Sequence, residues 1–151
     1  ILAWPKTYDA DDVLVPSSLA LAGEAGAGSS AAAQRLREAC LEHLRARIAE
    51  PLAPPKDWAR ENPLECRCAD CLALGEFLTD PGERQWRLRT AMDRRTHVEH
   101  SVRNATGCDV GLTTERKGSP HTLIATKNQA SYERRAAQRR QDLKHASALG
   151  G

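Results

Sequence analysis

Three cysteines within one short segment are the residues of this sequence best suited to chemistry. Cys66, Cys68 and Cys71 stand in a C-x-C-x2-C pattern, and Cys40 and Cys108 bring the total to five. An odd number of cysteines fits a disulfide framework poorly, and a bridge between Cys66 and Cys68 would close a strained small ring. Clustered thiolates are instead typical ligands of Zn²⁺, which accepts sulfur and nitrogen donors in a tetrahedral arrangement. The spacing therefore predicts a zinc site.

A zinc ion held by three cysteines needs a fourth ligand, and four candidates follow the cluster in the sequence. Residues 80–104 are predicted to form one helix, on which His97 and His100 lie opposite the main apolar stripe. We rank His97 first, His100 second and Cys108 third, with His121 further off. The alternative is that both helical histidines are exposed surface residues. Four protein ligands leave no open coordination position for a substrate, so the predicted site is structural.

The pattern of apolar residues predicts an α+β protein that is mainly helical, with one β-hairpin and a small zinc-centred lobe. Ser30 is placed to cap a helix over residues 31–50, whose apolar stripe includes Cys40 as a core residue. Asp80, in the sequence Asp-Pro-Gly-Glu, has the form of an N-cap for the helix over residues 80–104. The other predicted elements are a short helix starting near Ala69, the hairpin within residues 108–127 and a helix over residues 129–149.

Composition divides the chain into three segments. Residues 1–30 include a stretch rich in Gly, Ala and Ser and are predicted to be extended or flexible. Residues 31–63 combine a helical arm with a proline-rich connector, and residues 64–151 are predicted to form the zinc-binding α+β domain with a basic C-terminal helix. Aromatic residues make up only 4% of the chain. A core with so few large side chains is thin at this length, and a bound metal would offset that weakness.

Basic residues are concentrated in the later part of the chain. The net charge is +2, but residues 1–65 carry −3 and residues 66–151 carry +5. A basic segment can bind phosphate backbones or an acidic protein surface, although it can equally be a solvated helix face. The candidate partner-binding residues are Arg116, Lys117, Lys127, Arg134, Arg135, Arg139 and Arg140.

The signatures of several enzyme classes are missing from the sequence. It has neither a phosphate-binding glycine-rich loop nor a nucleophile-elbow serine. His97 and Glu99 match part of an iron facial triad, but residues two apart on a helix point in nearly opposite directions. We therefore predict that the chain is not an enzyme; the enzymatic alternative is a reactive thiolate at Cys68 or Cys71.

The expected setting of the chain follows from what its sequence does not contain. We find no signal peptide and no apolar run of membrane-spanning length, so we expect an intracellular, cytoplasmic location and no membrane partner. The first residue is Ile1 instead of Met, which suggests a fragment or a processed product.

Residues 58–143 contain an ordered series of motifs: C-x-C-x2-C from Cys66, F-L-x-D-P from Phe77, R-R-x-H from Arg94, T-x-E-R-K-G-S-P-H-T-L from Thr113, T-K from Thr126 and S-Y-E-R-R from Ser131. The series resembles a poorly characterised Cys/His-containing segment at the C-terminal part of large proteins of plants, fungi and bacteria, several of them related to 2-oxoglutarate/iron(II) oxygenases. The resemblance implies that the three cysteines and His97 form one set. It implies no oxygenase site here, because a double-stranded β-helix needs about eight strands and this sequence offers about two. Any oxygenase would lie upstream of Ile1.

Two functions are compatible with these features. The first is a non-catalytic zinc-binding module that binds a nucleic acid or an acidic partner surface, as the C-terminal part of a larger protein. The alternative is a scaffold domain that docks onto another protein or onto the rest of a larger, oxygenase-related polypeptide. The basic turn and helix near the C-terminus favour the first.

Overall fold

A computed structural model describes residues 8–24 and 29–151 of the chain. The fold is α+β and mainly helical, as predicted. None of the helices in the described residues combines the length and apolar character that a bilayer-spanning segment needs. In chain order the elements are η1 (Ala10–Leu14, a π-helical turn), α1 (Val15–Gly23), α2 (Ala31–Ala49), α3 (Ala69–Thr79), β1 (Gln85–Arg89), α4 (Met92–Asn104), β2 (Val110–Glu115), β3 (Thr122–Lys127) and α5 (Ala130–Ala148).

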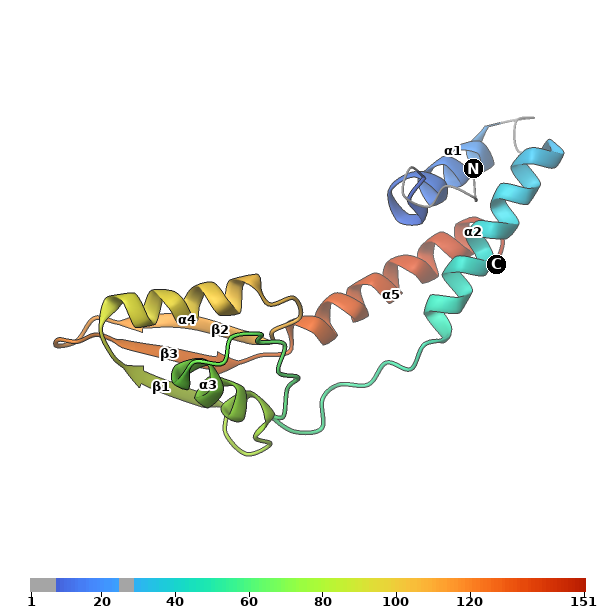
Figure 1. Cartoon of the computed structure of the whole chain (residues 1–151). Coiled ribbons are helices and arrows are strands. Elements are labelled where there is room, and N and C mark those ends of the chain that lie inside the picture. The colour runs from blue at the N-terminus through green and yellow to red at the C-terminus, as the bar shows by residue number, and fades with distance from the viewer. Residues whose placement is uncertain (1–7, 25–28) are drawn as a thin grey trace. The chain divides into compact units, whose positions relative to one another are not determined.

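The chain divides into two compact units, whose helices α1 to α5 and strands β1 to β3 are labelled in Figure 1. Unit 1 comprises Ile1–Leu52 and Arg135–Gly151, and unit 2 comprises Ala53–Arg134. This division differs from the three segments expected from composition. Most of the proline-rich connector belongs to unit 2, and the basic helix α5 passes into unit 1 at Arg135. The reason is that the buried side chains of α5 contact residues of unit 1 and do not belong to the core of unit 2.

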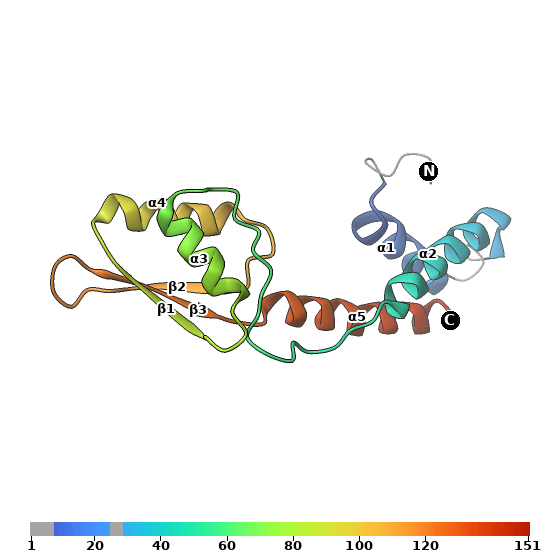
Figure 2. The same ribbon diagram turned by 60° about the horizontal axis from the view of Figure 1, so that its bottom comes forward.

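Unit 2 contains a three-stranded antiparallel sheet in the order β1-β3-β2. Strands β2 and β3 form the predicted hairpin, in which Val110 lies opposite Lys127 and Glu115 lies opposite Thr122. Helices α3 and α4 both lie over one face of this sheet (Figure 2). The core between the helices and the sheet consists of Leu64, Cys71, Leu74, Phe77, Leu78, Val98, Val110, Leu123 and Ala125.

Strand β1 corrects the prediction of one helix over residues 80–104. Oδ1 of Asp80 accepts hydrogen bonds from two following backbone N–H groups at 2.7 and 2.8 Å, as an N-cap would, but the chain then extends instead of coiling. Trp86 and Leu88 are half-buried while the other residues of Gln85–Arg89 are exposed, which is the alternation of a strand with one face on the core. Pairing with β3 satisfies the backbone N–H and C=O groups of this segment that point toward β3. A capping motif alone therefore does not determine a helix.

Unit 1 packs η1 and α1 against α2 and the later part of α5. Helix α1 differs from the extended or flexible segment expected over residues 1–30, and apolar burial explains it, since Leu14 and Val15 contribute to the core. The first seven residues of that segment and residues 25–28 of its Gly/Ala-rich stretch lie outside the described residues. The core consists of Leu14, Val15, Cys40, Leu41, Leu44, Ala146 and Leu149.

Helix α2 forms where the sequence predicts it. The Ser30 hydroxyl accepts a hydrogen bond from the Ala33 N–H at 3.1 Å and caps the helix, which ends at Ala49, just before Pro51. Cys40 is 3% exposed within the unit 1 core, so its prediction as a core residue is confirmed.

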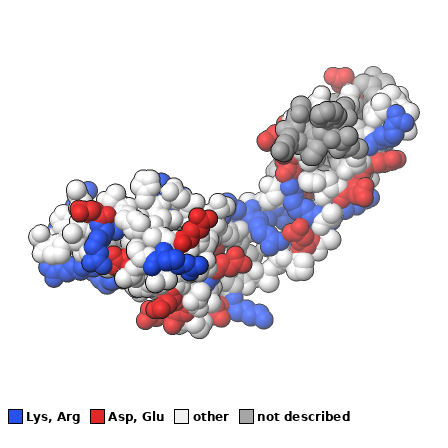
Figure 3. Space-filling view, viewed as in Figure 1, with Lys and Arg blue, Asp and Glu red and all other residues white. Residues whose placement is uncertain are grey.

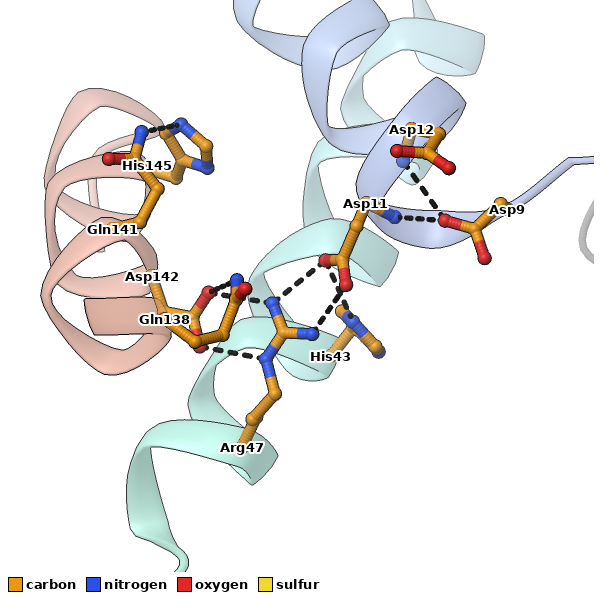
Figure 4. Close-up of polar contacts among 9 residues, drawn as sticks. All are labelled: Asp9, Asp11, Asp12, His43, Arg47, Gln138, Gln141, Asp142 and His145. Carbon is orange, nitrogen blue, oxygen red and sulfur yellow. Dashed lines mark hydrogen bonds and ion pairs between the residues drawn. The ribbon is translucent and has the colours of Figure 1, made fainter. Parts of the chain in front are cut away.

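Arg47 of α2 connects the earliest described segment of unit 1 with α5 (Figure 4). Its Nε and Nη2 atoms donate to the two carboxylate oxygens of Asp142 at 2.7 and 2.6 Å. Its Nη1 and Nη2 atoms donate to those of Asp11 at 2.6 and 2.8 Å. Asp142 is 0% exposed and also accepts a hydrogen bond from Gln138 at 2.9 Å. The guanidinium thus compensates a carboxylate that has no access to water.

The two carboxylates differ in what sets their pKa. Burial acts to raise the pKa of Asp142, but the hydrogen bonds from Arg47 and Gln138 outweigh it and leave the pKa below its usual value. The hydrogen bond from Arg47 lowers the pKa of Asp11. Both side chains therefore remain ionised in the folded chain at mildly acidic pH.

We expect unit 1 to lose stability as the pH falls below about 4. The folded pKa values of Asp11 and Asp142 lie below the unfolded ones, so the unfolded state binds more protons in this range. The stabilisation is complete above the unfolded pKa of about 3.9 and is lost as the pH falls through the folded values. Thermal unfolding followed by circular dichroism between about pH 2.5 and pH 6 measures it. Asp11→Asn should make the dependence shallower; equal slopes for this variant and the unaltered chain would contradict the assignment.

Candidate metal centre

The side chains of Cys66, Cys68, Cys71 and His97 come together on one side of unit 2. Nε2 of His97 lies 3.2 Å from Sγ of Cys66, 3.4 Å from Sγ of Cys68 and 3.6 Å from Sγ of Cys71. All four potential ligand atoms lie within 4.8 Å of one another. The four residues can therefore hold one metal ion.

These distances fit a tetrahedral ion. Bonds of about 2.3 Å to sulfur and about 2.1 Å to nitrogen at tetrahedral angles separate a sulfur from the nitrogen by about 3.6 Å. The three observed separations between His97 and the sulfurs lie at or slightly below this value. Three sulfurs and one imidazole form a donor set suited to a soft or borderline-soft metal ion, and not to Mg²⁺ or Ca²⁺, which prefer oxygen.

The start of α3 positions the three cysteines. Leu64 is 5% exposed in the core and anchors the segment that carries Cys66. Cys68 is the N-cap residue of α3, with φ −68° and ψ 160°. Cys71 lies in the first turn of the helix and is 1% exposed. The change from extended to helical backbone at Cys68 allows thiols on both sides of the cap to face the same point.

Helix α4 supplies the histidine, and an ion pair holds it against α3. Arg94 donates from Nε and Nη2 to the two carboxylate oxygens of Asp70 at 2.7 and 2.5 Å. Asp70 belongs to the first turn of α3, and Arg94 lies one turn before His97 on α4. Ser101, one turn after His97, donates to the His97 carbonyl at 3.0 Å and places its Oγ 3.5 Å from Sγ of Cys71. Contacts one turn before and one turn after His97 therefore hold its imidazole beside the three sulfurs.

The thiols of the cluster differ in how easily they ionise. The backbone N–H of Cys71, at the helix N-terminus, hydrogen-bonds to the exposed Cys68 sulfur and lowers the pKa of Cys68 to about 7. Burial raises the pKa of Cys71 to about 12. A coordinated divalent cation favours the thiolate form of every sulfur that it binds. The helix N-terminus and a metal would thus act in the same direction at Cys68.

The other three candidates for the fourth ligand lie outside the cluster. His100 is exposed on α4, and Cys108 packs half-buried against the unit 2 core, where burial raises its pKa to about 11. The His121 carbonyl accepts a hydrogen bond from Arg95 at 3.4 Å. Of the candidates, the structure brings only His97 within bonding range of the three sulfurs in the described part of the chain.

The predicted partner-binding residues are divided between the two units. Arg116, Lys117, Lys127 and Arg134 belong to unit 2, and the other three belong to unit 1. Arg135 pairs with Glu50 at 3.0 Å, and Arg139 donates to the Glu50 carbonyl at 3.3 Å. Arg140 is exposed.

Lys127 corrects the prediction that it contacts a partner. It is 1% exposed, because β3 directs it toward the core, as it does Leu123 and Ala125. Its Nζ donates to the Asp80 carbonyl at 2.5 Å and lies 4.4 Å from the centre of the Phe77 ring. Burial lowers the pKa of Lys127. This ammonium therefore stabilises the fold and is not available to a phosphate.

Two basic residues on the surface of the sheet are not among the partner-binding residues predicted from the sequence. Arg87 and Arg89 are exposed on β1, a segment predicted to be helical. The strict alternation of polar and apolar residues in Gln85–Arg89 was the signal that could have identified the strand.

Comparison of the chain with family models, curated proteins and solved structures finds no match. The resemblance to the Cys/His-containing segment therefore depends on the motifs alone.

Proposed function

We propose that unit 2 is a non-catalytic module whose fold is held by one structural Zn²⁺ bound to Cys66, Cys68, Cys71 and His97. The observation that carries this proposal is the convergence of four donor atoms within 4.8 Å from a loop and two helices. A bound zinc would join α3 to α4 through its bonds to the cysteines and to His97. Four protein ligands fill a tetrahedral coordination sphere, which leaves no position for a substrate.

We further propose that the module binds a polyanion, with a nucleic acid as the favoured partner. Support comes from Arg116 and Lys117, which are exposed in the turn between β2 and β3. Among the described residues, no carboxylate lies within ion-pair distance of either side chain. Unpaired cations on an exposed turn are suited to phosphate contacts.

The metal content of the purified full chain tests the first proposal. Elemental analysis should find about one zinc per chain. Substitution by Co²⁺ should give the visible absorption of a tetrahedral thiolate site. His97→Ala should lose most of the zinc, whereas His100→Ala, a matched change on the same helix, should retain it. A wild-type protein without bound metal, or an equal zinc content in the two variants, would contradict the proposal.

A further inference from the structure

The sheet of unit 2 has an outer face that neither helix covers. Directly opposed residues of an antiparallel sheet share a face, so the register assigns the outer positions. Those on β1 and β2 are exposed, and those on β3 are half-buried. The outer face consists of Gln85, Arg87, Arg89, Gly111, Thr113, Glu115, Thr122, Ile124 and Thr126.

The charge of this face is positive toward the β2–β3 turn. Arg87 forms an ion pair with Glu115 across the sheet, and Glu115 is the only carboxylate among the outer residues. Arg89 donates to the backbone carbonyls of the turn at 3.1 and 3.2 Å, and no carboxylate of the described residues forms an ion pair with it. Arg116 and Lys117 extend from the same turn. Figure 3 shows Lys and Arg side chains at the end of unit 2 where the turn lies in Figure 1.

The uncharged residues of the outer face indicate which kind of polyanion fits. Three threonines and Gln85 offer hydrogen-bond donors, which are common contacts of sugar and phosphate oxygens. Ile124 is the only large apolar side chain among the outer residues, so the face lacks the apolar centre typical of a protein–protein interface. It also carries no aromatic ring on which an unpaired base could stack.

We infer that the outer face of the sheet, together with the Arg116–Lys117 turn, binds the phosphate backbone of a nucleic-acid duplex. This inference rests on the proposed polyanion-binding function and assigns its surface and partner. Binding through phosphates is independent of sequence and depends strongly on salt. DNA and RNA duplexes both present a phosphate backbone, and parallel titrations with each show which of the two duplexes binds more tightly.

Charge reversal at the turn tests the surface. Fluorescence anisotropy of the full chain with a labelled duplex, measured from about 50 to 200 mM salt, gives the affinity and its salt slope. Arg116→Glu with Lys117→Glu should weaken binding roughly tenfold or more at the lowest salt and make the slope shallower by about 2. Arg35→Glu with Arg45→Glu, two exposed residues of α2, changes the net charge equally and should retain the affinity. Equal losses in both double variants would overturn the surface assignment.

Removal of the single outer carboxylate tests the same surface in the opposite direction. Glu115→Gln frees Arg87 for a phosphate and should make the salt slope steeper by about 0.9, whereas Glu42→Gln on α2 should not. Unchanged binding in Glu115→Gln would count against the outer face. Absence of duplex binding by the zinc-loaded wild-type chain at low salt would overturn the polyanion proposal itself. Equal competition by an acidic polypeptide would replace the nucleic acid with a protein partner.

Discussion

Removal of the metal is expected to unfold unit 2 and leave unit 1 folded. Structural zinc contributes about 10–16 kcal/mol of apparent binding free energy in small zinc domains, as much as the whole stability of an ordinary domain. Among residues 61–68, which carry Cys66 and Cys68, only Leu64 is deeply buried, so little besides the metal would hold these two cysteines against α4. Unit 1 contains none of the four ligands and has its own core.

Hydrogen exchange followed by mass spectrometry measures both units in one sample. On addition of excess chelator, residues 64–104 should lose their protection, and residues 31–49 should keep theirs. Cys71→Ala should behave like the chelated protein even with zinc present. Cys108→Ala, a cysteine of the same unit outside the cluster, should remain protected. Protection of residues 64–104 that survives in excess chelator would show that the metal is not structural.

Arg47→Ala is expected to lower the free energy of unfolding of unit 1 by about 3 kcal/mol at neutral pH. The change leaves the carboxylate of Asp142 buried with only the Gln138 amide to compensate it. An uncompensated buried carboxylate has a raised pKa, so the cost should shrink as the pH falls and Asp142 takes up a proton. Urea unfolding followed by circular dichroism at about pH 7 and pH 4.5 measures both effects.

Two controls separate buried charge from lost packing. Arg45→Ala, an exposed arginine of the same helix, should change stability by less than about 0.5 kcal/mol. Arg47→Leu combined with Asp142→Leu removes both charges and should recover much of the loss. If the double variant is as unstable as Arg47→Ala, the buried carboxylate is not the cause.

The Cys/His cluster was predictable because residues that can bind a metal together often leave a local pattern in the sequence. Three thiols within six residues can be recognised as a candidate metal site from the sequence alone. His97 and His100 are both predicted to lie on a helix, and both belong to α4. The ranking of His97 above His100 was a hypothesis that the sequence could not settle. It depends on how α4 packs against α3, which the pair Asp70–Arg94 helps to fix.

Features that depend on distant strands were harder to predict. The segment Gln85–Arg89 is a strand because β3, almost forty residues later in the sequence, pairs with it. The charge of Lys127 predicts a surface position, but the alternation in β3 places it on the same face as Leu123 and Ala125. Extending the strand alternation by one residue, from Thr126 to Lys127, predicts that this lysine is buried.

The arrangement of the two units determines the order in which a ribosome can complete them. Unit 2 is continuous in sequence, whereas unit 1 is built from segments on both sides of it. The buried partner of Arg47 is Asp142, which lies 95 residues later in the sequence and is synthesised after all of unit 2. During synthesis unit 2 can therefore acquire its native contacts first, and the early helices remain without their final packing until α5 leaves the exit tunnel.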